Sequence, residues 1–71
     1  MTPRYGLRVD LDGCRVLALD GLAPRDAVQW RRAVRSAFRF DGAEVTVATG
    51  CARVAEQWSG RAWMRRGEGR G

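Results

Sequence analysis

Apolar and polar residues alternate near the start of the chain, with the two-residue period of a β-strand. From Tyr5 to Leu11 the odd-numbered positions are apolar, and the even-numbered positions are glycine or charged. Asp12-Gly13 follows, and an Asp-Gly pair between two such runs is typical of a type I′ turn, which needs a positive φ at both residues. The pattern therefore predicts a β-hairpin whose second strand runs from Cys14 to Leu19.

A two-residue loop also fixes the register that we expect for this hairpin. The expected pairs are Leu11 with Cys14, Val9 with Val16 and Leu7 with Ala18. Leu17 and Leu19 then fall on the opposite side, which indicates a second strand that is interior to the sheet or partly covered on both faces. We expect Asp20-Gly21 to end this strand.

The period then changes to that of an amphipathic helix. Pro24 suits a first helical turn, Asp26 complements the helix dipole, and the helix is expected to run to about Phe38. One arc is apolar and is expected to lie on the sheet. Its residues are Ala27, Trp30, Val34, Ala37 and Phe38.

A third strand is predicted after Phe40-Asp41-Gly42, because the alternation returns there. Val45 and Val47 are expected to point to the core, and Thr49-Gly50 to make the next turn. Glu44 and Thr46 then point away from the core.

The segment from Cys51 to Met64 admits two interpretations. Its apolar residues also fit a helix capped by Thr49, which would give a ββαβα fold. Gly60 would cost about 1 kcal/mol in a helix interior, however, and Trp58-Ser59-Gly60-Arg61 is typical of a hairpin turn. We therefore favour an α+β fold, a ββαβββ antiparallel sheet with one amphipathic helix packed on one face.

The length of 71 residues allows a single domain with a small core. We expect that core to span about residues 4–65, and residues 66–71, rich in glycine and arginine, to form a flexible basic tail. The cysteines Cys14 and Cys51 have neither a CxxC spacing nor a histidine nearby, so no metal site is expected, and whether they approach one another is left open.

All 13 basic residues are arginines, and the formal net charge is +5. Arginine suits phosphate and carboxylate partners, although a genome rich in G and C would favour the same residue. Arginines cluster on the arc of the helix opposite its apolar side, which is either a solvated face or a binding face. Trp58 and Arg61 join them as candidates because both lie at a tight turn. The candidate partner-binding residues are Arg25, Arg31, Arg32, Arg35, Arg39, Trp58 and Arg61.

The chain contains few side chains of the kinds that act as nucleophiles or general bases. The chain has no histidine, and Ser36 and Ser59 have no base within sequence reach. Glu44, Glu56 and Asp41 are interpreted as parts of a solvated strand face. With no secretory signal and no apolar run near the ~20 residues that span a bilayer, we expect a cytoplasmic, non-enzymatic binding protein without a cofactor and without a membrane partner.

The order of a strand pair, one helix and a three-strand meander, with Gly50, Gly60 and Trp63 punctuating its end, resembles small phage-encoded anti-CRISPR inhibitors of type I systems. The resemblance spans about Asp12 to Met64. It implies a non-enzymatic inhibitor that docks on a CRISPR surveillance complex. Many such inhibitors that mimic DNA are acidic, whereas this chain is basic, so acidic protein surface, guide RNA and DNA all remain candidate contacts.

Two other functions fit the same sequence. The first is a nucleic-acid-binding module that contacts DNA or RNA directly. The second is an assembly subunit whose helix or edge strand pairs with a copy of itself, so that the chain is a monomer or a homodimer.

Overall fold

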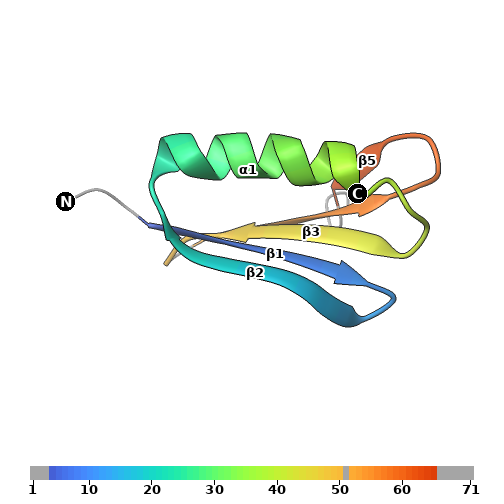
Figure 1. The fold of residues 1–71 in the computed structure, drawn as a ribbon, viewed down its shortest axis with the longest axis horizontal. Helices are drawn as coiled ribbons and strands as arrows, with labels where there is room; N and C mark the ends of the chain where they lie inside the picture. Colours follow the sequence, from blue (N-terminus) through green and yellow to red (C-terminus); the bar gives the residue numbers. More distant parts are fainter. Residues whose placement is uncertain (1–3, 51, 66–71) are drawn as a thin grey trace.

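The protein folds into two layers, an antiparallel sheet and a single helix that lies across one of its faces (Figure 1). The computed structural model describes residues 4–50 and 52–65. The elements are β1 (Tyr5–Leu11), β2 (Cys14–Leu22), α1 (Pro24–Ala37), β3 (Ala43–Ala48), β4 (Arg53–Trp58) and β5 (Trp63–Arg65). The ββαβββ prediction is confirmed, and the ββαβα alternative is wrong because β4 and β5 form a hairpin. The expected tail at 66–71 and any approach of Cys14 to Cys51 lie outside the described residues.

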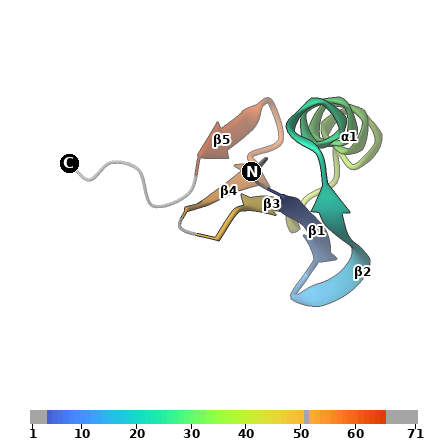
Figure 2. The same ribbon diagram turned by 90° about the vertical axis from the view of Figure 1, so that its left-hand side faces the viewer.

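The strands are arranged in the order β2-β1-β3-β4-β5 (Figure 2). The chain leaves β2 at one edge, passes through α1 over the sheet and returns as β3 on the far side of β1. The prediction that the second strand lies inside the sheet is therefore wrong, because β2 is an edge strand. No helix in the described part of the chain is long and apolar enough to cross a membrane.

The first hairpin turns as its Asp-Gly pair predicts. Asp12 has φ 51° and Gly13 has φ 84°, the positive values of a type I′ turn, and Leu11 pairs with Cys14. The next pairs differ from the expected register. They are Asp10 with Arg15, Val9 with Leu17, Arg8 with Ala18 and Leu7 with Leu19.

A β-bulge at Val16 explains this difference. The extra residue shifts the rest of β2 by one position, and a shift of one residue moves each side chain to the other face of the sheet. Leu17 and Leu19 consequently pack against the core, while Val16 is left 49% exposed. Because the bulge brings the leucines to the core side, β2 does not have to be covered on both faces, as the regular register would require.

A second irregularity occurs at Asp20 and Gly21. The strand continues to Leu22, so the prediction that Asp20-Gly21 ends it is wrong. Gly21 has φ 72°, a conformation that glycine adopts without strain, and the pairing with β1 resumes between Leu22 and Tyr5. Here the glycine bends the strand instead of terminating it.

The helix α1 has the limits that the sequence predicts, within one residue. Pro24 opens it, Asp26 lies in its first turn, and the Phe38 N–H donates to the Val34 carbonyl at its end. Its rotation about its own axis differs from the prediction. Ala27 and Val34 are buried against the sheet, as expected.

Trp30 and Ala37 are the corrections to the predicted apolar arc. Trp30 is 43% exposed and Ala37 is also exposed, so neither belongs to the buried side of α1. Arg31 and Arg35, which the helical pattern places on the outer arc, instead point toward the sheet and are half-buried. The helix is thus rotated toward β4.

The core lies between α1 and the middle of the sheet. Leu7 and Val9 of β1 and Val45 of β3 are fully buried, and Val34 of α1 packs on them. Val45 and Val47 point inward, as the alternation of β3 predicts. Partly buried apolar side chains surround this cluster: Leu17, Leu19, Leu22, Phe38, Val47 and Trp63.

Candidate nucleic-acid interface

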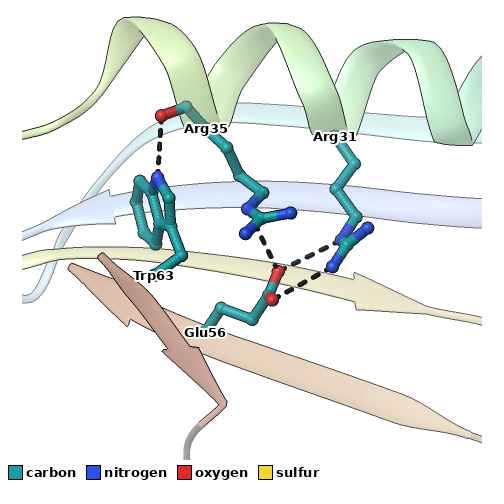
Figure 3. A network of polar contacts seen from close by, with 4 residues as sticks. All are labelled: Arg31, Arg35, Glu56 and Trp63. Carbon is teal, nitrogen blue, oxygen red and sulfur yellow. Dashed lines mark hydrogen bonds and ion pairs between the residues drawn. The ribbon is translucent and has the colours of Figure 1, made fainter.

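A buried carboxylate joins the helix to the second half of the sheet. Glu56 on β4 is 6% exposed and faces α1 (Figure 3). Arg31 donates two hydrogen bonds to it, from Nε to Oε1 at 3.1 Å and from Nη2 to Oε2 at 3.0 Å. This forked geometry is the strongest arrangement that arginine and a carboxylate form.

Arg35 lies on the other side of the same carboxylate. Its Nε is 3.7 Å from Oε1 of Glu56, and its backbone carbonyl accepts a hydrogen bond of 2.7 Å from Nε1 of Trp63 (Figure 3). That carbonyl is in the last turn of α1, where no partner within the helix is available. Together these contacts fix the helix to β4 and β5.

The fold therefore separates the predicted binding arginines into those that pair with Glu56 and those that do not. Arg31 and Arg35 serve Glu56, so their side chains are committed within the protein. The helix tolerates this pair of like charges, which are four residues apart, because one carboxylate lies between them. The binding role expected for these two arginines remains a prediction, but they do not lie on the free outer face.

Glu56 is the residue that sequence reasoning missed. From the sequence alone it is interpreted as part of a solvated strand face. It stands, however, two residues after Val54 and two residues before Trp58, and side chains in a strand alternate between the two faces. Residues two apart share a face, so the hairpin interpretation of this segment already places Glu56 on the apolar side. A carboxylate on an apolar strand face, opposite a helix rich in arginine, was the available signal.

Arg25 and Arg32 form the part of the predicted site that stays free. Both are exposed on α1, seven residues and about two helical turns apart, so their side chains project from the same side. Neither has an ion pair among the residues that the structure describes. They are the cations on the helix that remain available to a partner.

Arg39 and Trp58 are brought together at the carboxyl end of the helix. The guanidinium carbon of Arg39 is 5.8 Å from the ring centroid of Trp58, within the range of a cation–π contact. Trp58 also contacts Trp63, with ring centroids 5.6 Å apart and planes tilted by 60°. Trp58 is half-buried, so the exposed anchor expected at this position is in fact partly enclosed.

Arg61 is exposed in the turn that follows Trp58. The Ser59 N–H and hydroxyl both donate to the Ala62 carbonyl at 3.0 Å, and Gly60 has φ 95°, which closes a tight turn. No described residue pairs with the Arg61 side chain. We call the set Arg25, Arg32, Arg39 and Arg61 the cationic face.

The opposite face of the sheet carries charges of both signs. Arg8 lies 3.2 Å from Asp20, and Arg15 lies 3.3 Å from Asp10. A hollow of about 500 Å³ opens on this face, and its charged lining residues are Arg8, Asp10, Arg15, Glu44 and Arg53. The sequence alone does not predict this hollow, whose wall combines three arginines with two carboxylates.

Metal ligands and similar proteins were the two other sources of information about the function of this surface. Within residues 4–50 and 52–65, no group of three or more histidine, cysteine, aspartate or glutamate side chains is placed to hold a metal ion. Comparisons with protein-family models, with curated proteins and with solved structures find no match to this chain. The geometry of the arginines is therefore the basis for assigning a function.

Proposed function

We propose that this chain is a small, non-enzymatic binding protein whose cationic face contacts the phosphate backbone of nucleic acid, free or within a nucleoprotein complex. The observation that carries the proposal is that some arginines form ion pairs within the protein and others do not. Glu56, Asp10 and Asp20 engage Arg31, Arg35, Arg15 and Arg8. The four arginines of the cationic face have no ion pair among the described residues, and outside this set only Arg4 and Arg53 share that property there. Exposed arginines without an acidic partner suit a polyanion.

The position of Trp58 supports the same proposal. The Arg39 guanidinium lies over the half-buried Trp58 ring, so the indole holds this arginine in place without neutralising its charge. The absence of histidine from the chain supports a role in binding over one in acid–base catalysis.

A salt series tests this proposal. The purified protein is titrated against a generic double-stranded DNA at several salt concentrations, and the slope of log affinity against log salt is measured. Each phosphate contact contributes about −0.9 to that slope on duplex DNA, so contacts from the cationic face should give a steep negative slope. An affinity that does not change with salt, or no binding at low salt, would contradict the proposal.

Inhibition of a CRISPR surveillance complex is a narrower form of the proposal, and it rests on the resemblance of the element order to type I anti-CRISPR inhibitors. In this form the cationic face covers guide RNA or the path of target DNA within the complex. The test is binding of target DNA by a purified type I surveillance complex, with and without the protein. Loss of DNA binding supports the inhibitor role, and unchanged binding removes it while leaving direct contact with nucleic acid intact.

A further inference from the structure

The outer edge of β2 is the longest stretch of strand in the fold without a second neighbour. β2 spans Cys14–Leu22, pairs with β1 along one side and has no strand on the other side within the described residues. Arg4 reaches the Gly21 carbonyl, at 3.3 Å, near one end. An edge with free backbone groups is a template for another strand unless the protein covers it.

The helix side above this edge is apolar. Arg31 and Arg35 point toward β4 (Figure 3). Trp30 lies about 100° round the helix from Arg31, on the other side of the buried Ala27 and Val34, so helical geometry directs it away from β4 and toward the β2 side of the sheet. Trp30 is 43% exposed and, with Gln29 and Ala33, lines a shallow hollow of about 240 Å³. A large exposed indole next to an open sheet edge is a feature of an interface more than of a solvated surface.

Leu17 and Leu19 connect these two features. Both lie on β2, on the face that α1 covers, and both are only partly buried. The β-bulge at Val16 precedes them and the irregularity at Gly21 follows, so the regular part of the edge is the stretch 17–19. The free edge and the two leucines thus lie on the side of the molecule toward which helical geometry directs Trp30.

We propose that this surface binds a second copy of the chain, with β2 pairing antiparallel to β2 of the partner about a two-fold axis at Ala18. In this arrangement Leu17 lies opposite Leu19 of the partner subunit on the helix side. The sheets of the two copies join edge to edge, and both helices lie on the same face. Each Trp30 then covers the leucines in the space between the two helices.

Self-pairing suits this edge for reasons of symmetry and charge. A strand that pairs antiparallel with itself makes an isologous contact, in which one patch serves both copies. Ala18 at the axis is small. Arg15 at one end of the strand comes close to Asp20 of the partner subunit at the other end, where each would extend the ion pair that it already makes within its own chain. Arg25 and Arg32 project away from β2, so the net positive charge does not concentrate at the contact.

A cysteine at the axis tests the register directly. In a background of Cys14→Ser and Cys51→Ser, Ala18→Cys places two thiols opposite each other. Directly opposed Cα atoms in antiparallel strands are about 4.5–5.5 Å apart, inside the range that a disulfide spans. Mild oxidation should give a covalent dimer in non-reducing electrophoresis.

Val28→Cys in the same background is the matched control, because Val28 is 58% exposed on the helix and lies outside the proposed contact. Cross-linking of the Ala18→Cys variant well above the Val28→Cys variant supports the proposal. Equal cross-linking of the two variants would overturn it.

The oligomeric state provides the second measurement, and it needs no engineered cysteine. Sedimentation equilibrium of the unmodified protein should show a dimer in equilibrium with a monomer. Trp30→Glu should weaken association about tenfold or more, whereas Arg25→Glu should not. A monomer mass across the whole concentration range would overturn the proposal, and this result would leave the proposed contact with nucleic acid unaffected.

Discussion

Glu56 determines how the charged helix of this protein is used. Its carboxylate is nearly buried and holds Arg31 through a forked pair of hydrogen bonds, with Arg35 beside it. A buried carboxylate adds little stability by comparison with an apolar residue, but removing the charge leaves its half-buried partners unpaired. The side chain therefore sets the rotation of α1 over the sheet.

Glu56→Gln should lower the free energy of unfolding by about 2 kcal/mol, because the amide cannot accept both hydrogen bonds from Arg31 or neutralise Arg35. The measurement is chemical denaturation followed by tryptophan fluorescence. Asp41→Asn, at an exposed loop position, removes the same charge and should leave the stability nearly unchanged. Equal midpoints for the two variants would show that Glu56 does not hold the helix.

Gly42 provides a second test at the scale of a single residue. It has φ 87°, its carbonyl accepts a hydrogen bond from the Asp12 N–H at 3.0 Å, and a Cβ at this position would collide with the Asp12 carboxylate. Gly42→Ala should therefore destabilise the protein by about 1–2 kcal/mol or more in thermal unfolding. Gly50→Ala is the control, since a Cβ there meets nothing within 4 Å, and its melting temperature should change little.

At the scale of the elements, the β-bulge in β2 decides which side chains form the core. The bulge places Leu17 and Leu19 beside Leu7 and Val9, and it leaves Val16 in solvent. A hairpin with regular pairing would bury Val16 and expose the two leucines. One extra residue in one strand thus reverses the pattern of burial along most of β2.

Leu17→Ala and Val16→Ala distinguish these two registers. We expect Leu17→Ala to cost about 1–2 kcal/mol, because it removes a partly buried side chain that packs on the core. Val16→Ala should change the stability by less than about 0.5 kcal/mol. Urea denaturation of both variants is the measurement, and a larger loss for Val16→Ala would restore the regular register.

The sequence predicted correctly the turns and element boundaries that depend on a few neighbouring residues. The Asp12-Gly13 turn, the start of α1 at Pro24 and the hairpin between β4 and β5 each depend on a few neighbouring residues, and each is present. The alternation of apolar residues cannot reveal a bulge, because an extra residue changes the pairing without changing the sequence pattern. The position of β2 at the edge depends on strand order, which no single segment encodes.

The candidate site was predicted in part for the same reason. A helical wheel identifies the arginines of α1 but not the direction in which the helix faces. That direction depends on Glu56, a residue on another element and far along the chain. The free arginines could therefore be separated from Arg31 and Arg35 only when the tertiary contacts were known.

At the scale of the whole molecule, the two layers carry different distributions of charge. The open face of the sheet balances Arg8 and Arg15 against acidic neighbours, while the cationic face on the helix side has no such balance among the described residues. The net charge of the chain draws it toward any polyanion. The location of the free arginines determines which side makes contact.

The most direct test of this account compares two double variants that lose the same charge from opposite layers. One is Arg25→Ala with Arg32→Ala, from the cationic face, and the other is Arg15→Ala with Arg53→Ala, from the open face of the sheet. The measurement is the affinity for double-stranded DNA over a salt series. We predict that the helix variant loses affinity and that its salt slope becomes shallower by about 1.8, whereas the sheet variant retains most of both. Equal losses in the two variants, or a larger loss in the sheet variant, would contradict a binding role for the cationic face.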